Sequence, residues 1–230
     1  MDRFFDWNLI WDSLPDVLDG FVLNLEMMFV AEALTLVWGL VIVLIRTAPG
    51  RWALPVRILG MVYVDVFRGI PLIVLFALIG FGIPTAFPAL SVIPLFWLAV
   101  ASLVLAYGAY VAEVYRAGIE SVHPSQRAAA RALGLSYGKA MRYVILPQAV
   151  RRVIPPLMND FVSLQKDTAL ASTIGVLDAL NVANVIAGNT FNYSPVVGVA
   201  LCFLVITVPM TRLVDWLVER DRRRMRAQIA

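Results

Sequence analysis

The sequence predicts an all-α integral membrane protein that crosses the bilayer five times. Of its 230 residues, 60% are hydrophobic and only 15% are charged, whereas an average globular chain is about 45–50% apolar and about 25% charged. The apolar residues also gather into five stretches, each close to or above the ~20 residues that a membrane-crossing helix needs. A soluble protein of this size could not bury so much apolar surface, and the exposed remainder would cause aggregation.

The predicted spans follow one another with connections of different lengths. They cover residues 20–45, 58–83, 94–117, 154–176 and 194–217. The fourth is interrupted by polar residues, so a re-entrant or cytoplasmic hairpin is its alternative, and Pro155 and Pro156 are expected to kink its start. Residues 1–19 are acidic and aromatic. Because a secretory signal peptide begins with a basic region, this composition instead predicts an interfacial segment on the external side of the bilayer.

The Lys and Arg residues predict the orientation of the spans. Sixteen of the 19 fall into three regions, at residues 46–57, 116–152 and 212–226. The connections 84–93 and 177–193 contain none. Since positively charged loops stay in the cytoplasm, the N-terminus is predicted outside, and the C-terminus with its basic tail, residues 218–230, is predicted inside. The partition also argues against nucleic-acid binding, because the basic residues report topology, with contact to anionic membrane lipid as a secondary effect.

The longest predicted cytoplasmic segment, residues 118–152, has the composition of helices rather than of a loop. A strongly helix-forming run begins at Ser125, which is a suitable N-cap. Gly134 is expected to end this helix, and Ser136 to begin a second one that ends before Pro147. Two short amphipathic helices would form a protrusion suited to docking a partner protein. A solvated surface hairpin is the alternative.

Several chemistries are excluded by residues that the chain lacks. The single histidine, His123, excludes a His-based metal cluster, and the single cysteine, Cys202, excludes a disulfide framework. Residues 134–140 resemble a P-loop only superficially, because three residues instead of four separate the glycines and Ala140 stands where magnesium needs Ser or Thr. No hydrolase motif is present. The chain is therefore predicted to be no enzyme and to hold no metal or cofactor.

Four groups of residues form motifs that follow one another along the chain, at 68–72, 109–119, 125–134 with 145–149, and 166–170. Together they resemble the permease subunits of binding-protein-dependent ABC importers, and more narrowly the histidine/glutamine/glutamate-type branch for polar amino acids. The resemblance covers nearly the whole chain. One departure concerns the coupling loop, where the family usually has Glu-Ala-Ala and this chain has Ala128 in place of the glutamate. That change removes a charge that could contact the ATPase or stabilise a helix end.

The resemblance implies a type I ABC importer fold over residues 20–217 and a place in the bacterial inner membrane as a multi-pass protein. It also implies four kinds of partner: a dimer of ATP-binding subunits that holds ATP and magnesium, a second permease that is identical or paralogous, an external substrate-binding protein, and an amino-acid substrate. The implied ATPase-coupling residues are Gln126, Arg127, Ala128, Ala129, Ala130, Arg131, Ala132, Leu133 and Gly134. A stand-alone secondary transporter or channel is the alternative, but the inverted repeats that it would need are not visible.

Ionisable and polar residues inside the predicted spans are candidates for a substrate pathway, because they are costly in a bilayer. The candidates are Asp65, Arg68, Asn159, Ser163, Lys166 and Asp167. Asp65 and Arg68 are spaced to pair on one helix face, and the stripe at positions 159, 163 and 166 could face a central cavity. Such groups suit a zwitterion, with cations for its carboxylate and anions for its ammonium group. Pairing between spans without any substrate is the alternative.

Three further carboxylates lie in the predicted spans. Glu113 and Arg116 are three residues apart near the cytoplasmic end of the third span, and are predicted to be a structural or gating pair that joins the span to the coupling loop. Glu26 and Glu32 in the first span do not share a helix face. Glu32 would then need a partner on another span or a cavity-facing role.

Overall fold

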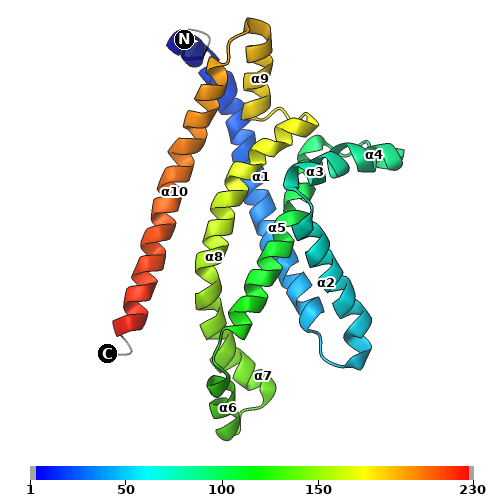
Figure 1. Ribbon diagram of the computed structural model, residues 1–230, viewed down its shortest axis with the longest axis vertical. Coiled ribbons are helices and arrows are strands. Elements are labelled where there is room, and N and C mark those ends of the chain that lie inside the picture. Colours follow the sequence, from blue (N-terminus) through cyan, green and yellow to red (C-terminus); the bar gives the residue numbers. More distant parts are fainter. Residues whose placement is uncertain (1–3, 228–230) are drawn as a thin grey trace.

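The computed structural model describes residues 4–227, and the side chains up to residue 220. Over this range all regular secondary structure is helical (Figure 1). The helices are α1 (Trp7–Thr47), α2 (Leu54–Gly69), α3 (Leu72–Ala77), α4 (Ile83–Ala86), α5 (Leu95–Glu120), α6 (Pro124–Ala132), α7 (Tyr137–Ala140), α8 (Leu146–Asp167), α9 (Ala179–Thr190) and α10 (Ser194–Ala227). Single turns of 3₁₀ helix, η1 (Arg51–Ala53) and η3 (Pro88–Leu90), lie in two of the connections.

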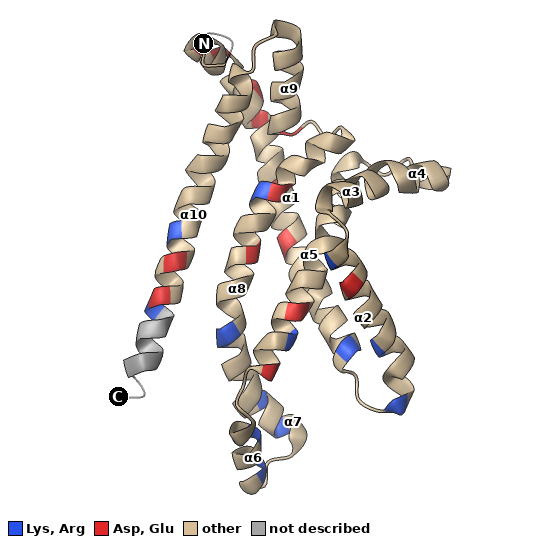
Figure 2. Cartoon of the chain, in the orientation of Figure 1, with Lys and Arg blue, Asp and Glu red and all other residues tan. Residues whose placement is uncertain are grey.

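The molecule is elongated, with α1, α2, α5, α8 and α10 running along its length (Figure 1). The hairpin of α6 and α7 lies at one end, and α9 lies near the N-terminus at the other. Lys and Arg are concentrated toward the half that carries α6 and α7 (Figure 2). The basic residues of the tail at positions 222, 223, 224 and 226 come after residue 220, so their side chains are not among those described.

Three single helices are long and apolar enough to cross a membrane, namely α1, α5 and α10. They contain the first, third and fifth predicted spans. Two bent helix pairs raise the number of spans to as many as five. The prediction of an all-helical chain with several apolar helices is therefore confirmed. Helix α1 also continues back to Trp7 without a break, so most of the segment predicted to lie at the interface is helical and joined to the first span.

The prediction of one continuous helix over residues 58–83 is wrong. Helix α2 ends at Gly69, and the chain then turns by 106° into a lateral arm of α3, the π-helical turn η2 (Leu78–Gly82) and α4. Ile70 has extended backbone angles, φ −86° and ψ 128°. The residue before a proline is pushed out of the helical region by the proline ring, so Pro71 accounts for the break.

The fourth predicted span is helical but not straight. Helix α8 contains Pro155 and Pro156 and continues through both of them to Asp167. It passes into the 3₁₀ helix η5 (Thr168–Ile174), which ends at Gly175 in the left-handed conformation, with φ +90°. Helix α9 follows at an angle of 48°. Between η5 and α9 the chain thus changes direction at a glycine, which adopts the left-handed conformation without a steric cost.

The centre of the molecule is formed by α1 and α5, which approach each other closely through small residues. A Cβ atom on Gly39 would lie 2.5 Å from Val111, and one on Gly108 would lie 2.5 Å from Trp38. Inside a bilayer the hydrophobic effect does not drive helices together, because lipid tails are as apolar as the side chains. Small residues at such contacts let the helix backbones approach closely, so that van der Waals packing can hold them. Around them is an apolar core whose fully buried members include Met27, Phe76, Leu103, Leu164 and Ile174.

A buried polar cluster fixes α9 to α1 at the end of the molecule opposite the hairpin. The Asn24 amide donates to Thr168 Oγ1 at 3.2 Å and to Asp178 Oδ2 at 3.0 Å, and it accepts from the backbone N–H of Ala179 at 3.1 Å. Asp178 also caps α9 by accepting from the N–H of Asn181 at 3.0 Å. Because every member is paired, the cluster specifies one arrangement of α1, η5 and α9.

Gly20 provides a test of this contact. A Cβ atom at Gly20 would lie 2.6 Å from the backbone nitrogen of Ala179, and backbone cannot move aside as a side chain can. Replacing Gly20 by Ala is therefore expected to lower the free energy of unfolding by about 1–3 kcal/mol. The matched control is Gly188→Ala on α9, where nothing lies within 4 Å. Equal thermal stability of the two purified variants would contradict the close packing of α1 against α9.

Candidate functional site: a basic hairpin and a polar cavity

The hairpin begins with α6, whose N-cap is His123. Its Nδ1 accepts from the backbone N–H of Ser125 at 3.2 Å. The prediction that Ser125 is the N-cap is therefore wrong. Pro124 occupies the first helical position, where its missing N–H costs nothing, so the helix starts two residues earlier than an N-cap at Ser125 would give.

Gly134 ends α6 as predicted. Its φ is +76°, and a Cβ atom there would meet nothing within 4 Å. The N–H of Leu135 donates to the carbonyl of Ala130 at 3.1 Å, and that of Gly134 donates to Arg131 at 2.9 Å. This pair of hydrogen bonds is a Schellman motif, which requires a left-handed residue and so favours glycine. The turn between the two helices of the hairpin depends on backbone conformation rather than on side-chain packing.

The second helix of the hairpin does not end before Pro147. Helix α7 follows Ser136 as predicted, but it passes through the π-helical turn η4 (Met141–Ile145) directly into α8. Pro147 lies in the first turn of α8, directly after the π-helical turn, and the helical path continues past it. The hairpin is consequently joined to α8 by helical turns without an irregular connection.

Basic and apolar side chains lie together on the outer surface of the hairpin. Arg127 and Arg131 border a hollow of about 520 Å³ that also contacts Tyr137 and Met141. Leu133 and Tyr137 are 81% and 79% exposed. Exposed large apolar residues beside two neighbouring arginines are typical of a protein-docking surface. Among the predicted coupling residues, only Ala130 is buried.

The hairpin is attached firmly to α5 and α8. Val122, Ile145 and Ala149 form a small buried cluster between the end of α5 and the start of α8. The Arg152 guanidinium donates to the backbone carbonyl of Ser121 at the same place. Movement of the hairpin would therefore be passed to both helices.

Glu113 on α5 is the centre of an ion-pair network. Its carboxylate pairs with the Arg116 guanidinium at 2.8 Å and also with Arg46 of α1. The prediction that Glu113 and Arg116 pair is confirmed. Arg46 was not identified from the sequence, because it is 67 residues away from Glu113 and no local spacing reveals it. The network joins α1 to α5 close to the hairpin end of the molecule.

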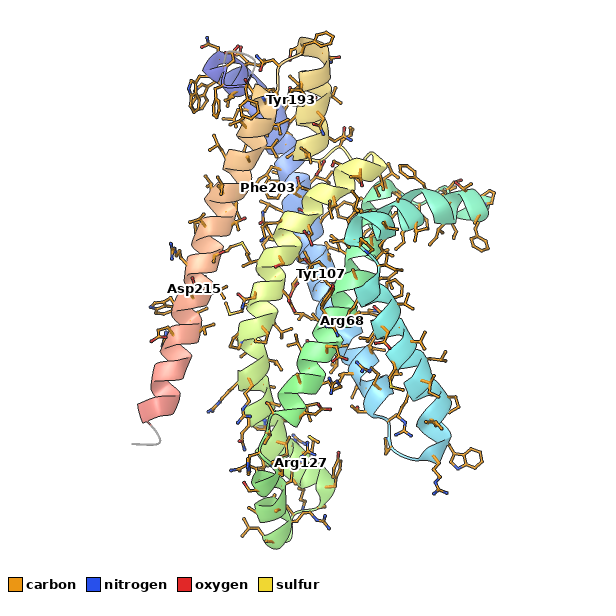
Figure 3. All side chains as sticks on the ribbon, viewed as in Figure 1. Arg68, Tyr107, Arg127, Tyr193, Phe203 and Asp215 are labelled. Atoms are coloured by element: carbon orange, nitrogen blue, oxygen red, sulfur yellow. The ribbon has the colours of Figure 1, made fainter. Side chains whose placement is uncertain are left out.

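A polar cavity of about 440 Å³ lies between α2, α5 and α8. Its polar lining consists of Arg68, Tyr107, Tyr110, Asp160, Ser163 and Asp167. Tyr107 donates its hydroxyl to Asp167 Oδ2 at 2.7 Å, and the Arg68 guanidinium lies over the Tyr110 ring at 5.3 Å from its centre. Figure 3 shows Arg68 and Tyr107 in the middle of the helical region, well away from Arg127 on the hairpin.

Three of the six predicted pathway residues line the cavity, namely Arg68, Ser163 and Asp167. Asp65, Asn159 and Lys166 are exposed and do not line it. The face of α8 that meets the cavity therefore carries positions 160, 163 and 167 rather than the predicted stripe at 159, 163 and 166. Both sets have helical spacing, so periodicity alone could not choose between them.

The ion pair predicted between Asp65 and Arg68 is not formed within the described chain. Arg68 instead stacks on Tyr110 of the neighbouring helix α5, a contact that arginine makes readily with aromatic faces. Tyr107 and Tyr110 were not among the predicted pathway residues, because they lie in an apolar span with no local signal of function. Over residues 4–227, no three His, Cys, Asp or Glu residues are arranged to hold a metal ion.

A multi-pass helical protein with a firmly attached basic hairpin and a polar cavity between its helices has the organisation of a membrane transport component. The chain belongs to the family of binding-protein-dependent transport system inner membrane components, whose family model matches residues 47–223. It is accordingly a protein of the inner membrane.

Individual relatives cover almost the entire chain. It is 37% identical over 223 residues to the glutamine transport system permease protein GlnP of Escherichia coli K12, covering 96% of this chain and 98% of GlnP. It is 32% identical over 207 residues to the arginine transport system permease protein ArtQ of Bacillus subtilis, covering 90% and 92% of the two chains.

The structure resembles those of two solved transporters. A crystal structure of an amino acid ABC transporter with histidines matches with a TM-score of 0.85 and 33% identity, covering 94% of this chain and 98% of that one. An inward-facing structure of the MetNI methionine ABC transporter matches with a TM-score of 0.68 at 16% identity, over 94% and 99% of the chains. The second match supports the fold alone.

Proposed function

We propose that this chain is the channel-forming permease subunit of an ATP-driven importer of polar or charged amino acids. The relatives named for glutamine and arginine transport support this class of substrate. The observation that carries the proposal is that α5 and α8 serve two purposes. Both are attached to the docking hairpin, and both line the polar cavity. A force applied to the hairpin therefore reaches the walls of the cavity.

In this proposal a separate ATPase dimer docks against the hairpin and holds ATP and magnesium. ATP binding closes that dimer and moves α6 and α7, which tilts α5 and α8 between inward-open and outward-open arrangements. Packed helices suit this task because they switch between discrete positions instead of deforming continuously. A second permease, identical or paralogous, completes the channel, and an external binding protein delivers the amino acid.

The orientation follows from the same proposal. The hairpin and the C-terminal tail face the cytoplasm, and the N-terminus and α9 face outside. The bent pairs that include α2 and α8 then each count as one span, which gives five. The clustering of Lys and Arg toward the hairpin half of the molecule supports this orientation (Figure 2).

The proposal is tested by transport in proteoliposomes. The chain is co-expressed with its candidate ATPase, with and without a paralogous permease, and uptake of radiolabelled amino acids is measured with and without ATP in the presence of the substrate-binding protein. We expect uptake only when both the ATPase and ATP are present. Uptake without the paralogue would indicate a homodimeric channel, whereas uptake only with it would indicate a heterodimer. Transport by the chain alone, driven by an ion gradient, would contradict the proposal and support a secondary transporter.

A further inference from the structure

His123 connects the anchored end of α5 to the first helix of the hairpin. Its neighbour Val122 is buried with Ile145 and Ala149, in the cluster that holds α5 to α8. Pro124 is already the first residue of α6. His123 itself is exposed, so protons from the solvent reach its imidazole ring. The single histidine of the chain therefore lies between the anchored part of the hairpin and α6.

The imidazole ring caps α6 only in its neutral form. Its Nδ1 accepts a hydrogen bond from the backbone N–H of Ser125 at 3.2 Å and lies 2.7 Å from Ser125 Oγ. Because Pro124 has no N–H, that of Ser125 is the first donor of the helix, and Nδ1 is its acceptor. An accepting ring nitrogen carries no proton, so the proton of the neutral ring is on Nε2. Protonation of Nδ1 turns the acceptor into a donor and removes the cap.

A positive charge on His123 would lie among other positive charges. It would be at the N-terminus of α6, where the helix dipole favours negative charge. Arg127 of α6 donates to the backbone carbonyl of Ile119 at 3.5 Å. Arg152 of α8 donates to the backbone carbonyl of Ser121. Two guanidinium groups are thus already bound along the connection that His123 ends.

The carboxylates of this region are occupied by other cations. Glu120, near the end of α5, pairs with Arg116 at 2.5 Å, and Glu113 pairs with Arg116 and Arg46. Among the side chains that the structure describes, no carboxylate forms an ion pair with His123. The neutral ring is therefore the form that fits this position.

We propose that His123 is a proton-sensitive cap that positions α6, so that a fall in pH on the hairpin side of the membrane weakens the coupling between the ATPase and the permease. This inference rests on the proposed function and adds a form of regulation to it. The charge of a histidine ordinarily changes between about pH 5 and 8. The cap is present while the ring is neutral and is lost as the pH falls through this interval. Losing one capping hydrogen bond shifts the equilibrium of a helix start about fivefold.

The first measurement is NMR of the histidine in the assembled permease–ATPase complex in nanodiscs. The permease is labelled with ¹³C- and ¹⁵N-histidine and purified through a tag that contains no histidine, and the ATPase is unlabelled. Because the chain has one histidine, the signal belongs to His123. We expect an unprotonated Nδ1 at about pH 7.5 and a ring with both nitrogens protonated at about pH 5.5.

The second measurement is ATP-dependent uptake in proteoliposomes, with the binding protein present, at about pH 7.5 and about pH 6 on the side of the ATPase. The ratio of uptake at the lower pH to uptake at the higher pH is expected to be about fivefold smaller for the unaltered chain than for His123→Asn. Asparagine caps a helix as well but does not titrate, and the pH dependence of the ATPase itself is common to both. His123→Ala, which cannot cap, should give reduced uptake at both pH values.

Glu120→Gln is the matched control. It removes the nearest carboxylate of α5 in the sequence but leaves the cap, so it should keep the pH dependence of the unaltered chain.

Two outcomes would overturn the inference. One is a protonated Nδ1 in the neutral ring at about pH 7.5. The other is an equal ratio of uptake for the unaltered chain and for His123→Asn. If the unaltered chain took up no amino acid at either pH, the proposed function would fail instead, and the NMR measurement would still decide whether the cap exists.

Discussion

Replacing Gly134 by proline is expected to abolish ATP-dependent uptake while leaving membrane insertion intact. The native φ of +76° is impossible for proline, whose ring fixes φ near −65°. Proline also removes the N–H that donates to Arg131. The angle between α6 and α7 would be lost, and with it the surface that we propose docks the ATPase. The change lies outside the spans, so the amount of protein in the membrane should stay the same.

Alanine substitutions separate the effect of conformation from that of packing. A Cβ atom would meet nothing within 4 Å at either Gly134 or Gly138, but only Gly134 has a positive φ. Gly134→Ala should therefore cost about 1 kcal/mol of hairpin stability and lower uptake, whereas Gly138→Ala should leave uptake unchanged. Uptake of radiolabelled amino acid, normalised to the amount of membrane-inserted protein, measures both. Normal transport by Gly134→Pro would contradict the coupling role of the hairpin.

Glu113→Gln is the second change with a large expected effect. The side chains of Glu113 and Arg46 are only 18% and 14% exposed, so removing the carboxylate charge leaves two guanidinium groups close together with little solvent. Removing one partner from such a partly buried pair is expected to lower the free energy of unfolding by about 1–3 kcal/mol, between the values for exposed and fully buried pairs. Helices α1 and α5 would separate at the hairpin end, and thermal unfolding of the purified complex would show the loss.

Glu120 provides the comparison within the same network. It also pairs with Arg116, but its side chain is 60% exposed. Exposed pairs contribute about 0–1 kcal/mol, so Glu120→Gln should have little effect on thermal unfolding. If Glu113→Gln and Glu120→Gln unfolded at the same temperature, the buried contact between Arg46 and Glu113 would not be a structural tie.

The sequence predicted those features that depend on local physical rules. Gly134 was identified as a helix end because few other residues tolerate a left-handed turn, and the structure agrees. Residues 94–117 were predicted as a span, and α5 covers all of them but Pro94, which is its N-cap. The break at Pro71 follows the same kind of local rule, but the apolar run on both sides of it concealed the turn. Hydropathy shows whether a segment is apolar, but it does not show whether the chain bends within that segment.

Features that depend on contacts between distant residues could not be predicted. Arg46 and Glu113 belong to different spans, and no spacing in the sequence connects them. Asp160 and Asn159 are neighbours, and only the packing of α8 against α5 and α1 decides which of them faces the cavity. The hydroxyl of Tyr107 belongs to the polar cavity because it donates a hydrogen bond to Asp167, which is 60 residues away in the sequence. Sites inside a helix bundle are assembled from such relations, so the residue types are readable from sequence but their grouping is not.

The central claim is that the hairpin is the ATPase-docking element, and cross-linking tests it most directly. In a Cys202→Ala background, a cysteine is placed at one of two exposed positions. One is Ala128 on α6, and the other is Val92, which is 82% exposed in the connection between η3 and α5. A short thiol-to-amine cross-linker is then applied to the assembled complex in membranes. The account predicts a cross-link to the ATPase subunit from Ala128→Cys and none from Val92→Cys. An ATPase cross-link from Val92→Cys, or none from Ala128→Cys in a complex that still hydrolyses ATP, would contradict it.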